Sequence, residues 1–217
     1  MGFKKTLTTG FAACAIALSV GATSALADSI TYNVTTGTNT TNWTSALTIP
    51  LFNTMLGSLQ SIDFALAGDV LGIVNITNTG ASTANITATL TSGITVTGPG
   101  GSTISTTASG SASGSVGGGG NVSLSPSGSS SSSSSTTNPA DLAAYSNPGG
   151  GSASGSASST GNCTVTGSSN IISQCQTQSG GTLGITYNYD AVPEPASLTI
   201  IGLGLAALGL RRRRRAA

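Results

Sequence analysis

Histidine is absent from this chain of 217 residues, and charged residues make up only 6% of it. A typical globular protein has about 25%. Without histidine the chain can hold neither a Ser-His-Asp triad nor an imidazole-ligated metal. Lysine and arginine occur only at Lys4, Lys5 and 211–215, so residues 6–210 carry no basic side chain. A nucleic-acid binder needs cations along the phosphate backbone, so this composition excludes nucleic acid as a partner.

Acidic residues are also few, and they are scattered along the chain. They are Asp28, Asp63, Asp69, Asp141, Asp190 and Glu194. A calcium ion takes about six to eight oxygen ligands, which isolated aspartates do not supply by themselves. We therefore expect no metal site and no cofactor.

One carboxylate pair in the middle of the chain could in principle act as general acid and base, as paired carboxylates do in glycosidases. Asp63 falls between Ile62 and Phe64, so alternation directs it outward, and Asp69 follows Gly68 in an expected turn. This placement favours solvated surface aspartates over a hydrolase. We predict no catalytic residue and no enzymatic activity.

The N-terminal residues have the three parts of a secretory signal peptide. Lys4 and Lys5 form a short positive region, and an apolar stretch rich in alanine and leucine follows. Ala25 and Ala27 then supply the A-x-A pattern that suits signal peptidase. We predict a signal peptide over residues 1–27, cut after its last residue. The alternative is an uncleaved membrane anchor, although the apolar run is short for a span.

The C-terminal residues 191–217 combine an extended segment, an apolar segment and a basic cluster. Prolines at positions 193 and 195 hold the chain extended ahead of a predicted helix over 196–210. That helix would be about 22 Å long, which is short for a hydrocarbon core of about 30 Å. Positive charge after it keeps the C-terminus in the cytoplasm and the body outside. The positive residues are Arg211, Arg212, Arg213, Arg214 and Arg215.

These C-terminal features closely resemble the PEP-CTERM sorting signal of exopolysaccharide-producing Gram-negative bacteria. Pro193, Glu194 and Pro195, the apolar span and the arginine cluster occur in the order of that signal. The resemblance implies that exosortase, a membrane cysteine protease and transpeptidase, recognises the Pro-Glu-Pro segment and then either releases the protein from its transient anchor or transfers it to another one. The alternative is a plain tail anchor with chance prolines.

Residues 28–190 between the two signals are dominated by serine, threonine, glycine and asparagine. Several runs alternate apolar and polar residues with period two, which is typical of half-buried strands. The apolar positions of these runs are Ile30, Tyr32 and Val34; Ile62, Phe64 and Leu66; Ile86, Ala88, Leu90, Ile94 and Val96; and Leu183, Ile185, Tyr187 and Tyr189. Glycine, proline and asparagine clusters separate them. We predict an all-β antiparallel β-sandwich.

Two segments lack this rhythm. Residues 98–137 form a low-complexity insert that includes four consecutive glycines at 117–120 and seven serines at 129–135. Such a segment has little to bury and much backbone entropy to lose, so we expect a flexible loop. Sparse apolar residues within it leave a weak edge strand as an alternative. Residues 149–161 are expected to form a second flexible stretch.

The body of the chain also resembles the choice-of-anchor E domain. Members carry a tryptophan, then an L-x-[LI]-P-x-F-[DN] element, then L-G-x-L ahead of a strand. In this chain those positions are Trp43, Leu47, Ile49, Pro50, Phe52, Asn53, Leu56, Gly57 and Leu59. The family pairs one extracellular domain with alternative surface anchors, so the resemblance implies an extracellular location and names no reaction.

Cys163 and Cys175 are the two cysteines left after signal cleavage. Their spacing is far from C-x-x-C, which makes a redox motif or a zinc site a poor interpretation. Export favours a disulfide between them, and two free thiols are the alternative. Trp43 is the single tryptophan. It could stack on a sugar ring, or it could pack in the core or at its rim.

We therefore predict an exported, non-enzymatic protein of the cell surface or exopolysaccharide matrix with a structural or adhesive role in biofilm. Its partners would be signal peptidase, exosortase, the membrane as a transient anchor and, through hydroxyl and amide groups, extracellular polysaccharide. The alternative is a carbohydrate-binding module of the matrix.

Overall fold

The computed structural model describes residues 27–167, 170–192 and 204, and within them it confirms the all-β, antiparallel prediction. The predicted signal peptide, except for Ala27, lies outside the described residues, as do the sorting residues Pro193, Glu194 and Pro195 and the five arginines. The predicted membrane helix over 196–210 also lies outside them, apart from position 204. None of the helices in the described ranges has the length and apolar character that crossing a membrane requires.

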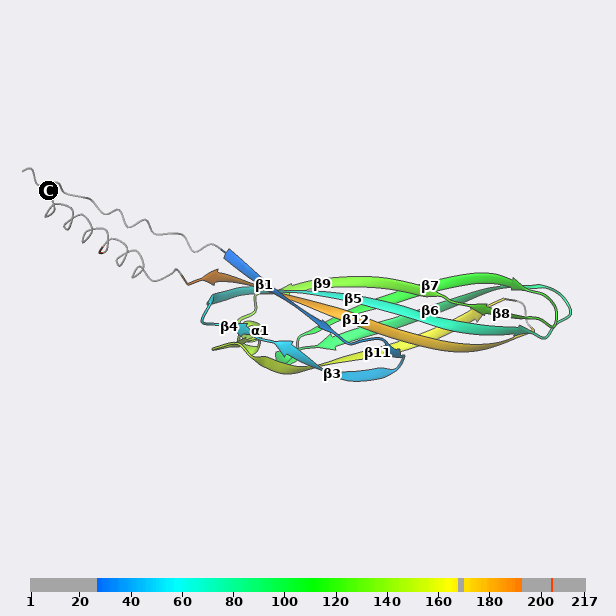
Figure 1. Cartoon of the computed structure of the whole chain (residues 1–217), viewed down its shortest axis with the longest axis horizontal. Coiled ribbons are helices and arrows are strands. Elements are labelled where there is room, and N and C mark those ends of the chain that lie inside the picture. Colours follow the sequence, from blue (N-terminus) through cyan, green and yellow to red (C-terminus); the bar gives the residue numbers. More distant parts are fainter. Residues whose placement is uncertain (1–26, 168–169, 193–203, 205–217) are drawn as a thin grey trace, which may run out of the picture.

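Two antiparallel sheets stack face to face in an elongated sandwich (Figure 1). Sheet A has the order β1-β12-β5-β8, with β2 also paired to β12 and β9 also paired to β5. Its strands are β1 (Ala27–Thr35), β2 (Asn39–Thr40), β5 (Gly57–Asn78), β8 (Asn121–Leu124), β9 (Ser127–Thr136) and β12 (Ile171–Ala191). Sheet B has the order β3-β11-β6-β7. Its strands are β3 (Trp43–Pro50), β6 (Ala84–Thr97), β7 (Thr103–Val116) and β11 (Ser152–Thr166).

The remaining elements gather at one end of the sandwich, opposite β8 (Figure 1). The short strands β4 (Phe52–Asn53) and β10 (Ser146–Asn147) form a parallel pair. Helix α1 (Pro139–Ala144) begins after Asn138, whose side chain accepts a hydrogen bond from the Ala140 amide at 3.0 Å. The 3₁₀ turn η1 (Pro99–Gly101) joins β6 to β7. This end therefore carries the irregular backbone, whereas the rest of the described body consists mainly of long strands.

Alternation accounts for the strands as predicted. In β6 every second residue from Ala84 to Val96 is buried, and the residues between them are partly or fully exposed. Threonine fills most of the outward positions, because its branched side chain suits the pleated surface. The longest pairing joins β5 to β12 and shifts register once, between Asn188 and Tyr189.

The core consists of two hydrophobic clusters separated by small and polar residues. One cluster contains Phe64, Leu66, Ile94 and Leu183, and the other contains Val70, Leu90 and Ala108 among others. Between them five of the strands direct a small or hydroxyl-bearing residue inward, and we call these residues the polar belt. They are Gly68 of β5, Ser92 of β6, Thr106 of β7, Ser159 of β11 and Ser179 of β12.

The expectation of a flexible insert over residues 98–137 is wrong, because β7, β8 and β9 lie within this segment. Strand β9 contains the serine run, and its backbone pairs with β5 from Ile62 to Leu71. Backbone hydrogen bonds of a ladder do not depend on apolar side chains, so a serine strand can join a sheet that neighbouring residues stabilise. The second expected flexible stretch, 149–161, is likewise wrong from residue 152 onward, where β11 begins.

Glycine explains how the insert closes one side of the sandwich. Strand β7 is the edge of sheet B, and β9 lies at the edge of sheet A. A Cβ atom added at Gly110 would collide with the backbone of Ser127, and one added at Gly128 would collide with the backbone of Ser109. The two edges can therefore approach this closely only because both positions lack a side chain.

Candidate functional site

The two aspartates considered for acid–base chemistry do not form a site. Asp63 and Asp69 both lie in β5, on the outward face of sheet A, so the expectation that Asp69 lies in a turn is wrong. They are six positions apart along the strand, which is about 20 Å. Paired carboxylates of glycosidases lie roughly 5–9.5 Å apart. Asp63 is exposed and accepts a hydrogen bond from Nδ2 of Asn188 at 2.7 Å, so it has an ordinary structural partner.

Trp43 packs at the rim of the first hydrophobic cluster, where it is partly buried. Its indole Nε1 donates to the carbonyl oxygen of Ser179 at 3.2 Å and to the hydroxyl of the same residue at 3.1 Å. The polar edge of the ring is therefore directed across the sandwich from β3 to β12. This arrangement is the packing alternative of the sequence interpretation, and it leaves the indole N–H engaged within the protein.

The hydroxyl that Trp43 contacts belongs to a buried chain of serines in the polar belt. Ser179 Oγ lies 2.6 Å from Ser159 Oγ, which in turn lies 2.8 Å from Ser92 Oγ. All three side chains are at least 98% buried. Burying hydroxyl groups is costly unless each is hydrogen-bonded, and this chain satisfies them in sequence across both sheets. Among the described residues no buried side-chain polar atom lacks a partner.

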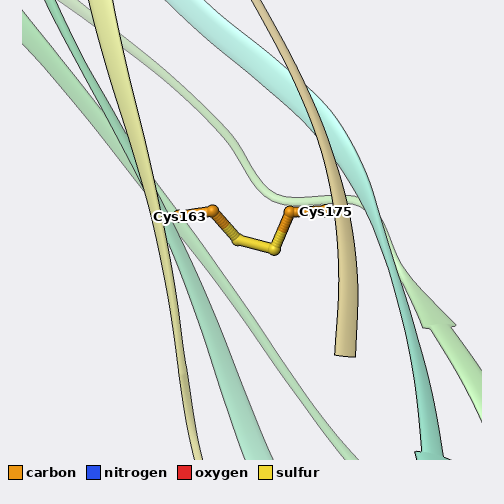
Figure 2. The surroundings of a disulfide bond; sticks show 2 residues. All are labelled: Cys163 and Cys175. Atoms are coloured by element: carbon orange, nitrogen blue, oxygen red, sulfur yellow. A yellow bond between two sulfur atoms is a disulfide. The ribbon is translucent and has the colours of Figure 1, made fainter. Parts of the chain in front are cut away.

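A disulfide joins Cys163 of β11 to Cys175 of β12, and so it links sheet B to sheet A. Figure 2 shows the two side chains reaching toward each other from separate strands. The Cα atoms lie 6.5 Å apart. The two strands are consecutive along the chain. In sheet B, β6 lies between β11 and β7, and in sheet A, β5 lies between β12 and β9, so the disulfide and the contact of β7 with β9 are on opposite sides of the sandwich. It therefore fastens the side of the sandwich that the glycine contact does not close.

The outer face of sheet B is an uncharged array of hydroxyl groups, which we call the hydroxyl face. None of its four strands contains a charged residue. In three of these strands, β6, β7 and β11, the outward positions are almost all serine or threonine. They are Thr87, Thr89, Thr91, Thr95 and Thr97 in β6; Thr103, Ser105, Thr107, Ser109, Ser111, Ser113 and Ser115 in β7; and Ser154, Ser156, Ser158, Thr160, Thr164 and Thr166 in β11.

Strand register places these hydroxyls in rows across the sheet. Thr164, Thr89 and Ser111 lie opposite one another, and Thr166, Thr87 and Ser113 form the next row. Neighbouring groups are about 6.7 Å apart along a strand and about 4.8 Å apart between strands. Each hydroxyl offers one donor and two acceptor lone pairs. The face can therefore form many hydrogen bonds with a neutral polyol and no ion pairs.

A pocket of about 260 Å³ opens beside α1, between the neighbouring ends of β7 and β9. Its inner wall is apolar and comes from Phe64, Val96, Ile104 and Leu183. Its polar lining includes Ser102, Thr103, the segment 134–136, Asp141 and Tyr145. Asp141 is the one carboxylate among these lining residues.

Hydrogen bonds fix the polar groups of this pocket. Thr136 Oγ1 donates to Oδ2 of Asp141 at 2.8 Å, and Tyr145 Oη lies 2.7 Å from Ser102 Oγ. Tyr145 is 99% buried, and that burial raises the pKa of its phenol, so the hydroxyl stays protonated at neutral pH. Sequence reasoning missed this pocket. The Asn-Pro pair at 138–139 signals a helix start, yet nothing local indicates which strands surround it.

Metal-ligating residues do not cluster in the described ranges: no group of three or more histidine, cysteine, aspartate or glutamate side chains could hold an ion. The described residues thus offer three features of interest: the hydroxyl face, the pocket and the disulfide. The sorting residues lie outside the described ranges, and sequence comparison addresses them.

Residues 191–214 match the PEP-CTERM protein-sorting motif. This match supports the sequence interpretation of the C-terminus: the chain carries the signal of an exported protein that exosortase processes and that is held transiently at the membrane by its C-terminus. The match does not test the resemblance of the body to the choice-of-anchor E domain, which stays a prediction. A search of curated proteins gives no match.

Solved structures show only weak overall similarity to the chain. A chain in the structure of infectious bursal disease virus, Gt strain, is 13% identical with a TM-score of 0.14, over 87% of this chain and 51% of that one. Parasporin-2 from Bacillus thuringiensis is 14% identical with a TM-score of 0.12, over 75% of this chain and 72% of that one. The chain thus spans about half the length of the viral protein, and these scores are too low to carry an argument.

Proposed function

We propose that the protein is a non-enzymatic component of the cell surface or exopolysaccharide matrix with a structural or adhesive role. Signal peptidase would remove residues 1–27, and exosortase would act near Pro193, Glu194 and Pro195. The helix over 196–210 would hold the protein until then, with the arginines in the cytoplasm. The observation that carries this proposal is the sorting motif at residues 191–214, because it is a signal of export and processing.

The composition of the surface supports an adhesive role toward neutral polysaccharide. The hydroxyl face spans three long strands of sheet B without a charge, and residues 6–210 contain no lysine or arginine. Ionic attraction to acidic polysaccharide would require cations that the body lacks. Hydrogen bonding by serine and threonine hydroxyls requires no charge, and many weak bonds to one polymer act together.

A substitution in the sorting motif tests processing. Replacing Pro193, Glu194 and Pro195 by alanine keeps the apolar segment and the arginines, so membrane insertion should continue while exosortase no longer recognises its substrate. The variant should accumulate in the membrane fraction with its arginines attached, as intact mass would show. Deleting exosortase from the host should give the same result with the native chain. If the triple variant were processed and released like the native protein, the Pro-Glu-Pro segment would not be a recognition signal and the tail would be an ordinary anchor.

A second experiment tests adhesion through the hydroxyl face. Replacing Thr89, Thr91 and Thr164 by valine removes three outward hydroxyls while keeping the shape and β-propensity of each side chain. Retention on a dextran column should fall and should depend little on salt, since no ion pair is involved. Matched replacements of Thr31, Thr182 and Thr186 on the outer face of sheet A should leave retention unchanged. If the sheet A variant lost as much retention as the sheet B variant, the hydroxyl face would not be the adhesive surface.

Carbohydrate binding at a defined pocket is the second candidate function. The observation that favours it is the pocket beside α1, which combines an apolar wall with fixed hydroxyls and one carboxylate. Trp43 gives this candidate less support, because its indole N–H bonds to Ser179 inside the sandwich. The two candidates are compatible, because a matrix component can bind a polysaccharide along one face and also bind a single sugar unit of it in a pocket.

A further inference from the structure

We propose that the pocket beside α1 binds a single neutral hexose residue, at the end or a branch of an extracellular polysaccharide. This inference rests on the proposed function as a matrix protein and names a second, discrete site for the same class of ligand. It draws on four properties of the pocket: its size, its two-sided lining, its charge and its rigidity.

Size limits the ligand to one sugar ring. The pocket holds about 260 Å³, slightly less than the roughly 300–1,000 Å³ typical of sites for drug-sized molecules. It opens between the start of β7 and the end of β9, beside α1. An oligosaccharide would have to extend outside, so the polymer would enter by a terminal or branching residue.

The lining matches the two kinds of surface that a pyranose presents. Phe64, Ile104 and Leu183 form an apolar wall that can contact the C–H face of a ring. Ser102, Thr136 and Asp141 lie on the polar part of the lining, where ring hydroxyls need donors and acceptors. Each of these groups already has one partner within the protein, and a purely apolar ligand would leave their remaining hydrogen-bonding capacity unused after displacing water, which costs free energy.

Charge selects a neutral sugar over an acidic one. Asp141 is the carboxylate of the lining, and residues 6–210 contain no lysine or arginine that could balance a second negative charge. A carboxylate accepts several hydrogen bonds, and Thr136 supplies one of them to Oδ2. Hydroxyl donors of a sugar can supply others, and such charge-assisted bonds are stronger than neutral ones. Because hydroxyl groups surround the carboxylate, the lining fits a neutral sugar with several hydroxyls better than a ligand with a single ammonium group.

The pocket is also built before a ligand arrives. Tyr145 is 1% exposed and bonds to Ser102, so its hydroxyl is fixed at the base of the lining. Asn138 caps α1 and Thr136 holds Asp141, so the carboxylate is fixed from both its own helix and the preceding strand. Groups that are fixed in the free protein lose little entropy on binding, which favours a weak but specific interaction with a small ligand.

The test titrates the protein as exported by the host with methyl glucopyranoside, methyl galactopyranoside and methyl mannopyranoside, and NMR and calorimetry detect binding. At least one should bind with millimolar affinity and shift the amide signals of Ser102, Ser134 and Asp141. Asp141→Asn should weaken that affinity about tenfold or more, as expected for a lost bond to a charged acceptor. Asp69→Asn removes the same charge from the outward face of β5 and should leave binding unchanged.

Several outcomes would overturn the inference. They are the absence of binding by all three glycosides, shifts that map away from the pocket, and equal affinity of Asp141→Asn and the native protein. Binding of sodium glucuronate or glucosamine as tightly as the neutral sugars would overturn the choice of ligand class. If Asp141→Asn has a lower melting temperature than the native protein, the NMR shifts of the native protein alone determine whether the sugar binds in the pocket. Retention on dextran without any glycoside binding would reject this pocket and leave the proposed matrix function standing.

Discussion

Cys163 of β11 and Cys175 of β12 connect the two sheets of the sandwich across the side that is opposite to the contact of β7 with β9. The two ends of this covalent link belong to consecutive strands in different sheets. The bond therefore closes a short loop of the unfolded chain while it ties together two separately hydrogen-bonded layers of the folded one.

Removing this bond should lower stability without changing the fold. A disulfide around a loop of this size typically stabilises by about 2–4 kcal/mol, mainly by restricting the unfolded chain. The Cys163→Ser, Cys175→Ser double variant should melt about 5–15 °C lower than the native protein in thermal denaturation. Non-reducing mass mapping of exported protein should find the two residues linked. Alkylation of both thiols in native protein would contradict the prediction.

Trp43 should prove to be a stability residue. Trp43→Phe keeps most of the apolar ring but removes the indole N–H that donates to Ser179. We expect a loss of about 1–2 kcal/mol in the free energy of unfolding, measured by urea denaturation, because the indole N–H that is shared between the two oxygens of Ser179 disappears. Retention on dextran should stay at the native level. Loss of retention with unchanged stability would favour the sugar-stacking alternative instead.

Sequence patterns predicted the strands whose side chains alternate, and they failed where the backbone alone determines the structure. Residues 84–97 show period two, and β6 occupies that range. The serine run of β9 has no apolar residue and so no period, yet it pairs with ten residues of β5. Its place in the sheet depends on pairing with β5, which is distant in sequence, and on the close contact of its own Gly128 with Ser109 of β7.

The pocket beside α1 illustrates the same limit for a site. Its lining joins Phe64 of β5, Ile104 of β7 and Asp141 of α1, which tertiary folding alone brings together. Each residue has an ordinary local interpretation as a strand core position or a first-turn helix acid. Asp63 and Asp69, by contrast, are near in sequence and far apart along an extended strand. Proximity in sequence is thus a poor guide to shared chemistry in a β protein.

Gly128 should tolerate no side chain. Gly128→Ala would place a methyl group against the backbone of Ser109 in β7, so β9 and β7 must separate. We expect a loss of about 2–3 kcal/mol, in line with overpacking at a tight contact. The matched control is Gly117→Ala, because no atom lies within 4 Å of the added Cβ. Equal melting temperatures of the two variants would show that the sheets are not in close contact there.

Buried tyrosines should make the protein sensitive to alkali. Burial raises the pKa of Tyr145 and Tyr187 above the ordinary value of about 10. The hydroxyl of Tyr187 also donates to the Pro50 carbonyl at 2.6 Å, a bond that its ionised form cannot make. The folded state therefore holds these protons more tightly than the unfolded state does. The contribution of these two tyrosines to stability is therefore constant below about pH 10 and falls as the pH rises above it.

The body of this chain allows that prediction to be tested cleanly. Residues 28–192 contain no lysine, arginine or histidine, and tyrosine is their only side chain that ionises near pH 10 once the cysteines are bonded. Melting temperature should be flat from neutral pH to about pH 9.5 and then decline, together with a cooperative rise in tyrosinate absorbance. Tyr187→Phe should lower stability at neutral pH and reduce the decline at high pH. Ionisation of all four tyrosines near pH 10 in a protein that stays folded would contradict the burial of Tyr145 and Tyr187.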